Sequence, residues 1–232
     1  MTDLPRGEPV AAPAAADELH AEIRGRDVVL RRPDPGADTP SLFAATHGSP
    51  EREAVWTYMG YGPWPDEAAM RSWVGGTLRS PDPFWWVVES VGIPVGMATV
   101  MNRDAVNRRA EVGHIWYAPR AQHTTVNTEA AYLMVRECFD TLECRRVEWK
   151  CDALNERSRV AALRLGFAFE GVFRHHMVVK GRNRDTAWYA MTRDDWNVAR
   201  PALEAWLYEV ARDASGRPLR SLVDLRSPGT SS

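Results

Sequence analysis

Apolar and polar residues alternate along several short stretches of the chain, and each stretch of this kind predicts a β-strand. The clearest example covers residues 109–117 (RAEVGHIWY). Regular alternation there places Ala110, Val112, His114 and Trp116 on one face of the strand and Glu111, Gly113, Ile115 and Tyr117 on the other. Six more strands are predicted, at residues 27–32, 84–90, 93–102, 146–151, 168–179 and 185–192.

Apolar residues that recur at intervals of three and four predict helices between these strands. The strongest pattern covers residues 127–142, whose apolar stripe consists of Ala131, Met134, Val135, Cys138, Phe139 and Leu142. Further helices are predicted at residues 40–47, 51–59, 66–78, 155–165 and 194–208. Asp66 is the expected N-cap of the third helix in that series, and Gly166 the expected left-handed residue that ends the fourth. The order of elements predicts a mixed α/β fold of the α+β type, not a doubly wound parallel sheet or an all-β sandwich.

Two unpatterned ends flank this patterned region. Residues 1–24 are rich in alanine and proline, which predicts a flexible N-terminal leader. Residues 211–232 mix glycine and proline with charged residues, which predicts a loose C-terminal tail. Residues 25–210 between them are expected to form a single domain, because the sequence contains no internal repeat.

Charge and cysteine content narrow the classes of function. The 232 residues include 29 Lys and Arg against 31 Asp and Glu, a formal charge of −2, which argues against a nucleic-acid partner. No apolar run approaches the roughly 20 residues that span a bilayer, and no secretory signal precedes the domain, so no membrane partner and a cytoplasmic location are expected. The three cysteines form no C-x-x-C pair and the six histidines have no metal-ligand spacing, so no metal site is expected.

Two segments carry candidate chemistry. The strand at 109–117 leads through an irregular loop to a helix that opens at Asn127, and the free N–H groups of a helix start can bind a phosphate. An ordinary strand-to-helix turn would look the same. In the second segment Asn155 follows a strand and opens a short helix, where it can act as an N-cap, and Ser158 lies three residues later as a ligand contact or a solvated hydroxyl.

Taken together, four motifs resemble the GNAT superfamily of acyl-CoA-dependent N-acyltransferases. They are E-V-G-H-I-W (111–116), T-E-A (128–130), N-x-x-S followed by R-L-G-F-x-x-E-G (155–171), and a closing hairpin G-x-x-R-D (181–185) followed by Trp196. The chain is similar, more narrowly, to the branch that acetylates the N-termini of ribosomal proteins. The resemblance covers residues 26–208 and implies a mixed sheet of about seven strands, splayed between the strands at 109–117 and 145–151, with helices on both faces.

The resemblance also implies acetyl-CoA as co-substrate and places it on particular residues. The pantetheine arm would pair with the backbone of Ile115, Trp116 and Tyr117, while Asn155 would bind the pantetheine or substrate side. The pyrophosphate would rest on the loop and helix start formed by His123, Thr124, Thr125, Val126, Asn127 and Thr128. This loop lacks the two glycines usual in the superfamily, and the hydroxyls of Thr124, Thr125 and Thr128 are alternative donors.

Transfer of an acyl group to an amine requires loss of a proton from the amine, a donor for the developing oxyanion and support for the leaving thiolate. Glu111 is the candidate general base, directly or through water; alternatively it pairs with Arg108 or Arg109 at an exposed strand end. Ser158 is the candidate support for the sulfur, and a backbone N–H near Ile115 or Trp116 the candidate oxyanion donor.

The segment between the first strand and the first hairpin is rich in aromatic residues, which either line the acceptor side of the cleft or belong to the core. The sequence therefore predicts an N-acetyltransferase that moves acetyl from acetyl-CoA to a primary amine, on a protein N-terminus or a small molecule, by direct attack in a ternary complex. Two alternatives stay open: transfer of succinyl or another acyl group, and a GNAT-fold binding module with weak or no CoA binding. The resemblance also implies a homodimer.

Overall fold

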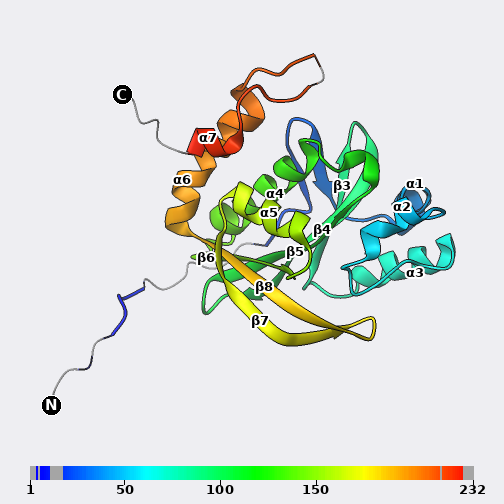
Figure 1. Ribbon diagram of the computed structural model, residues 1–232, viewed down its shortest axis with the longest axis horizontal. Helices are drawn as coiled ribbons and strands as arrows, with labels where there is room; N and C mark the ends of the chain where they lie inside the picture. Colours follow the sequence, from blue (N-terminus) through cyan, green and yellow to red (C-terminus); the bar gives the residue numbers. More distant parts are fainter. Residues whose placement is uncertain (1–3, 5, 11–17, 215, 227–232) are drawn as a thin grey trace.

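An eight-stranded sheet forms the centre of the molecule in the computed structural model, which describes residues 4, 6–10, 18–214 and 216–226. The strands follow the order β1-β2-β3-β4-β5-β6-β8-β7, and every neighbouring pair is antiparallel except β5 and β6 (Figure 1). Their bounds are β1 Glu22–Arg24, β2 Val28–Arg31, β3 Phe84–Ser90, β4 Ile93–Asp104, β5 Arg109–Tyr117, β6 Arg146–Asp152, β7 Ala168–Val179 and β8 Arg182–Thr192. The mixed α+β sheet is confirmed, and β1 is the strand that the sequence pattern did not predict.

Helices cover both faces of this sheet, as expected. The larger set consists of α4 Val126–Arg136 with its π-helical extension η3 Glu137–Thr141, α5 Glu156–Leu165, α6 Arg193–Glu204 with η4 Ala205–Glu209, and α7 Leu222–Arg226. The other set consists of α1 Pro35–Thr46, α2 Pro50–Glu53, η1 Ala54–Trp56 and α3 Glu67–Thr77, and a short turn η2 Pro119–Ala121 follows β5. We call the two sides of the sheet the α4 face and the α1 face.

The two predicted capping residues cap their helices as expected, Asp66 at the start of α3 and Gly166 at the end of α5. The Asp66 carboxylate accepts a hydrogen bond from the backbone N–H of Ala69 at 2.8 Å. Gly166 has φ +109 and ends α5 in the left-handed conformation that a residue with a Cβ rarely adopts. These caps fix where α3 begins and where α5 turns into β7.

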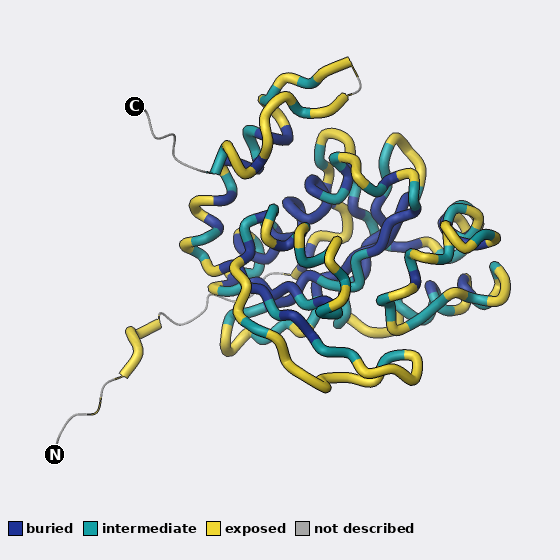
Figure 2. Tube along the Cα trace, in the orientation of Figure 1, coloured by how far each residue is buried: buried dark blue, intermediate teal, exposed yellow. Residues whose placement is uncertain are grey.

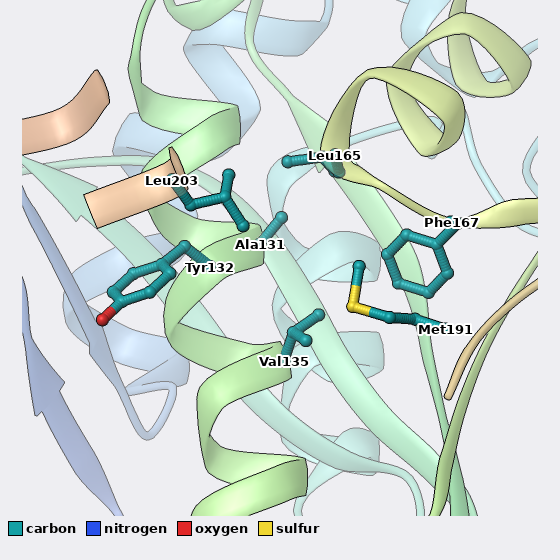
Figure 3. Close-up of a pocket in the computed structure, with 7 residues that line it drawn as sticks. All are labelled: Ala131, Tyr132, Val135, Leu165, Phe167, Met191 and Leu203. Carbon is teal, nitrogen blue, oxygen red and sulfur yellow. The ribbon is translucent and has the colours of Figure 1, made fainter. Parts of the chain in front are cut away.

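The main core lies between the sheet and α4, α5 and α6, and Figure 2 shows the tube mostly buried along α4 and the central strands. The predicted stripe of α4 and η3 faces this core, and five of its six members are buried: Ala131, Met134, Val135, Cys138 and Phe139. Figure 3 shows how α4 side chains meet those of α5, β8, α6 and the residue before β7 there; the labelled residues are Ala131, Tyr132, Val135, Leu165, Phe167, Met191 and Leu203. This packing fixes α4 on the sheet and thereby sets the position of its N-terminus.

A second core cluster holds α1, η1 and α3 against the α1 face. Its buried members are Leu42, Trp56, Met70, Val74, Trp85, Val87, Met97 and Trp116. Most of the aromatic side chains of the front segment are therefore packed together, which agrees with the core alternative. The cluster also reaches β5 through Trp116, so it forms the wall of the sheet beside the candidate site.

Both ends of the domain extend further than the sequence pattern predicted. Leu19 is only 5% exposed and the backbone N–H of His20 donates to Glu137 Oε1 at 2.8 Å, so the predicted leader is packed from Leu19 onward. The predicted loose tail contains α7, in which Leu222 is 2% exposed. Short apolar anchors in a polar sequence carry no periodic signal, which is why both boundaries were wrong. Residues 1–3, 5, 11–17, 215 and 227–232 of the predicted ends lie outside the described residues.

Within the part of the chain that the structure describes, no helix is long and apolar enough to cross a membrane. The same residues contain no group of three or more histidines, cysteines, aspartates or glutamates arranged to hold a metal ion.

Candidate active site at the fork of the sheet

The sheet opens where β5 and β6 part. Parallel pairing between them begins at Arg109 and Arg146 and ends at Val112 and Trp149. Beyond that point β5 continues to Tyr117 with only β4 beside it, and β6 continues to Asp152 with only β8 beside it. The β5 edge from Gly113 to Tyr117 is therefore open to an extended ligand, which can pair with it as an added strand.

A β-bulge in β5 lies directly above this fork. Trp116 pairs with Met97 of β4 and Gly113 pairs with Thr99, so β5 contains one extra residue between these two pairs. His114 has φ +49, a conformation that is uncommon for a residue with a Cβ. Among the described pairs of β4 and β5, neither His114 nor Ile115 has a register partner.

This bulge overturns the predicted faces of β5. Ile115 and Tyr117 pack in the main core on the α4 face, together with Ala110 and Val112. Trp116 packs in the second cluster on the α1 face, where His114 contacts Trp85 at a ring-centroid distance of 5.0 Å. The expected alternation was wrong beyond Gly113 because one inserted residue moves all later side chains to the opposite face.

The helix start beside the fork is open. Thr125, the N-cap of α4, accepts no side-chain hydrogen bond from the helix. The hydroxyl of Thr124 donates to the Ala121 carbonyl at 2.7 Å, and the buried hydroxyl of Thr128 accepts from Arg164 Nη2 at 2.6 Å. These two hydroxyls are engaged within the chain, and the Val126 N–H donates to the Thr124 hydroxyl at 3.3 Å. The donors left for an anion are the other backbone N–H groups of the predicted segment from His123 to Thr128.

Asn155 and Ser158 lie at the same open end of the fork. The Asn155 side chain accepts from the backbone N–H of Ser158 at 3.2 Å and thus caps α5. The Ser158 hydroxyl accepts from Trp149 Nε1 at 2.9 Å and interacts through its own hydrogen with the Cys151 thiol, so it already donates toward a sulfur within the chain. Ser158 is thereby tied to the last β6 residue that pairs with β5, and the structure brings both predicted residues to the fork.

Glu111 lies immediately below the fork, on the α1 face, with 5% of its surface exposed. Its Oε2 accepts from Asn102 Nδ2 at 2.7 Å and forms an ion pair with Lys150 Nζ at 2.8 Å. Its Oε1 lies 3.5 Å from the position that a Cβ on Gly113 would take, which directs this oxygen toward the bulge. The alternative pairing was wrong, because Arg108 pairs with Glu143 and Arg109 with Asp104 and Glu148.

Lys150 is a residue of the candidate site that the sequence patterns did not single out. It is the first β6 residue beyond the paired segment, and its Nζ lies 3.9 Å from the centre of the Trp188 ring. The same amine is 3.3 Å from Glu148 Oε2, so one lysine lies between two buried carboxylates. Alternation in RVEWKC, which places Glu148 and Lys150 on one face, was the available signal.

Aromatic rings form the wall of the α1 face beside the bulge. The rings of Trp56 and Trp116 are 4.7 Å apart, and those of Tyr61 and His114 are 5.6 Å apart. The tip of the β7–β8 hairpin closes this wall, because Lys180 Nζ donates to the Trp56 carbonyl at 2.8 Å. Burial, together with the positive charge of Arg184, lowers the pKa of His114 to about 4, so its imidazole is neutral at pH 7.

A sheet forked beside an open helix start is the arrangement that the sequence motifs implied for an acyl-CoA-dependent acyltransferase. A family model described as an acetyltransferase (GNAT) domain matches residues 27–168, more than half of the chain, and the protein therefore belongs to the GNAT acetyltransferase family. A GCN5-related N-acetyltransferase from Brucella melitensis is similar over nearly the whole fold: it is 34% identical with a TM-score of 0.87, over 93% of this chain and 98% of that chain.

Among curated proteins, YdaF of Bacillus subtilis strain 168, whose name refers to ribosomal N-acetylation, is 34% identical over 101 residues. Those residues make up 44% of this chain and 55% of YdaF, so the match spans about half the length of that relative.

Proposed function

We propose that this protein is an N-acetyltransferase that transfers acetyl from acetyl-CoA to a primary amine by direct attack in a ternary complex. The observation that carries the proposal is the fork: main-chain pairing stops at Val112 and Trp149 although β5 and β6 both continue. The open β5 edge fits an extended pantetheine arm, and the open start of α4 fits a pyrophosphate. The names of the relatives favour an amine acceptor, with a protein N-terminus as the first candidate.

Glu111 supplies the base in this proposal. A free α-amino group has a pKa of about 8 and a lysine of about 10.4, so either amine must lose a proton before it attacks. Asn102 and Lys150 both hold Oε2, which leaves Oε1 facing the bulge to accept that proton, directly or through one water molecule. The ion pair with Lys150 and the hydrogen bond from Asn102 hold the carboxylate in one orientation beside the bulge.

In this proposal the bulge supplies the donor for the developing oxyanion, and α5 supplies the support for the leaving thiolate. His114 and Ile115 have no partner in the described register of β4, so a backbone N–H of this segment can turn toward the developing oxyanion. Ser158 accepts from Trp149 and can redirect its own hydrogen from the Cys151 thiol to the departing sulfur. Asn155 holds the N-terminus of α5, and with it Ser158, in place.

Turnover and binding measurements test this proposal together. Thiol release from acetyl-CoA with a panel of amines should be detectable, and calorimetry should show binding of acetyl-CoA. Absence of both would leave the GNAT-fold binding module as the better description. Glu111→Gln should lower kcat by about 10²- to 10⁴-fold, the range of general base catalysis.

Glu148→Gln is the matched control for this variant, because it removes another buried carboxylate beside the same lysine. Its kcat should stay close to that of the wild type. Equal losses in the two variants would mean that the ion-pair network, not a base at Glu111, supports activity.

Asn102→Gly tests whether Glu111 must be held. Asn102 has φ +51, which glycine adopts without strain, so the variant loses the amide donor while the turn is retained. We expect a lower kcat with an unchanged KM for acetyl-CoA. An unchanged kcat would show that Lys150 alone orients the carboxylate.

We also propose a homodimer in the cytoplasm. The outer edge of β7 has no neighbour in the sheet, and its exposed apolar side chains include Phe173, Met177 and Val178. A long apolar edge of this kind favours pairing with a second chain. The three cysteines are free and buried, which fits a reducing compartment. In analytical ultracentrifugation, Val178→Lys should lower the fraction of dimer in favour of the monomer. A wild type that sediments as a monomer at all concentrations would contradict the dimer.

A further inference from the structure

Arg184 is placed where the fork opens. β6 ends at Asp152, which pairs with Thr186 of β8. Arg184 comes two residues before Thr186 in the antiparallel strand β8, and it therefore lies beyond the end of β6. Burial lowers the pKa of His114 of β5 and the charge of Arg184 lowers it further, whereas on Cys151 of β6 burial raises the pKa and the charge of Arg184 partly opposes that rise. The guanidinium therefore lies within electrostatic range of both strands that border the opening.

This guanidinium has no counter-ion among the described residues. Its Nε is buried without a hydrogen-bond partner, and the side chain forms no ion pair. Two nearby carboxylates, one adjacent in sequence and one at the paired end of β6, are engaged: Asp185 accepts from the His175 backbone and Asn183, and Asp152 from the Leu154 backbone. By contrast, Arg146, another half-buried arginine of the sheet, is paired with Glu148 and Glu170.

A further donor without an acceptor lies on the wall of the same opening. Tyr61 Oη and Trp116 Nε1 are both buried, and the indole N–H of Trp116 interacts only with the Tyr61 oxygen, which leaves the Tyr61 hydroxyl hydrogen without an acceptor among the described residues. The Tyr61 ring lies 5.6 Å from His114, and burial raises the pKa of its hydroxyl against a smaller opposite effect of the Trp116 indole. Buried polar groups in folded proteins are normally satisfied, so a group of unsatisfied donors marks a place for a ligand that accepts hydrogen bonds.

We infer that the α1 side of the fork binds a carboxylate of the substrate, with Arg184 as its counter-ion. A planar guanidinium matches a carboxylate in two parallel hydrogen bonds. Arg184 is a single unpaired charge, because the neighbouring Lys150 is already held by Glu111 and Glu148, and one charge suits a monoanion better than a phosphate dianion. This inference rests on the proposed transferase function and makes Arg184 a specificity-determining residue within it.

The carboxylate can belong to either substrate. It can lie on the acceptor, as the α-carboxylate of an amino acid or an acidic side chain at a peptide N-terminus, or at the far end of a dicarboxylic acyl group such as succinyl. The α1 face is the side that the amine must approach to reach Glu111, and this favours the acceptor.

Paired substrates that differ only in the carboxylate test the inference. Phenylalanine against phenylalaninamide, and an Asp-Phe amide against an Asn-Phe amide, probe the acceptor. Succinyl-CoA against butyryl-CoA probes the acyl group, measured by calorimetry as well as by turnover. We expect the wild type to favour the carboxylate partner of at least one pair by about 10- to 100-fold.

In Arg184→Gln the preference should disappear while activity on the neutral partner of each pair is retained, and Arg184→Lys should keep part of it. Arg182→Gln is the matched control, since Arg182 is an exposed arginine on the same strand. If the preference is lost only in the amine pairs, the carboxylate belongs to the acceptor. If it is lost only for succinyl-CoA against butyryl-CoA, the carboxylate belongs to the acyl group.

The inference would be overturned by a wild type that shows no preference in any pair. It would also be overturned if Arg184→Gln lowered the activity on both substrates of a pair by the same factor. Failure of the proposed transferase function is distinguishable, because it would abolish turnover with every amine. The binding of succinyl-CoA relative to butyryl-CoA would then still decide whether Arg184 receives a carboxylate.

Discussion

Gly96 offers the sharpest test of how β4 supports the bulge. It pairs with Tyr117, and a Cβ built on Gly96 would lie 2.1 Å from the Trp116 carbonyl oxygen and 2.9 Å from Tyr117 Cδ1. Ordinary contact begins at 3.4 Å, so the Trp116 carbonyl would have to move by about 1.3 Å. Because the obstacle is backbone and cannot rotate away, we expect Gly96→Ala to cost about 3 kcal/mol, the upper end of the usual overpacking range.

Thermal unfolding measures that cost. For a chain of this length about 3 kcal/mol corresponds to a decrease in Tm of about 6–12 °C. The same displacement would distort the β5 edge at Trp116, so calorimetry should show weaker binding of acetyl-CoA at temperatures where the variant is still folded. Weakened binding with unchanged stability would place the effect on the ligand alone.

Gly76→Ala is the matched control, because Gly76 lies in α3 with nothing within 4 Å of its added Cβ. Replacement of a helical glycine by alanine stabilises a protein by about 0.5–1 kcal/mol. A Tm in Gly96→Ala equal to or above that of the wild type would refute the close approach of β4 and β5 and, with it, the described bulge.

Three further changes test other contacts. Glu129→Ala removes the acceptor of the Arg26 and Asp27 backbone N–H groups at 2.6 and 2.9 Å and should cost about 1–3 kcal/mol for each, seen in denaturant unfolding. The pKa of His114 is about 4 in the folded protein against 6.5 in the free side chain, so the unfolded state binds more protons between these values. The free energy of unfolding should then fall as pH decreases from about 6.5 to 4, and His114→Asn should reduce that fall. Asn155→Ala removes the α5 cap and should lower stability by about 1 kcal/mol while raising KM for acetyl-CoA; unchanged KM would restrict Asn155 to capping.

Much of this architecture could be predicted because it depends on local patterns. Alternation identified seven of the eight strands, and the three- and four-residue spacing of Met134, Val135 and Cys138 identified α4. The eighth strand, β1, has three residues and is held by Leu19 and by Glu129, which accepts from the turn that follows it. Contacts across about 100 residues leave no periodic trace in a strand this short.

Residues of the candidate site could be predicted only where a sequence motif lies within one local element, such as a helix start. Asn155 and Ser158 lie three residues apart at the start of a helix, and their mutual hydrogen bond follows from that spacing. Lys150 and Arg184 act instead through partners on other strands, Glu111 and His114, whose proximity depends on sheet order. The bulge at His114 alone reversed the expected faces. Positive φ is more frequent for histidine than for most residues with a Cβ, but it stays uncommon, so one histidine in a strand does not predict a bulge.

The bulge also explains why the fork stays open. Regular parallel pairing requires evenly spaced N–H and C=O groups along both strands, and the inserted residue at His114 breaks that spacing in β5 immediately after Gly113. β6 cannot extend its pairing past Trp149 on such an edge and continues with β8 instead. Across this limit the Lys150–Glu111 ion pair joins the two strands through their side chains. The same inserted residue therefore ends the main-chain pairing, directs His114 and Trp116 to the α1 face, and sets the level at which Glu111 faces the opening.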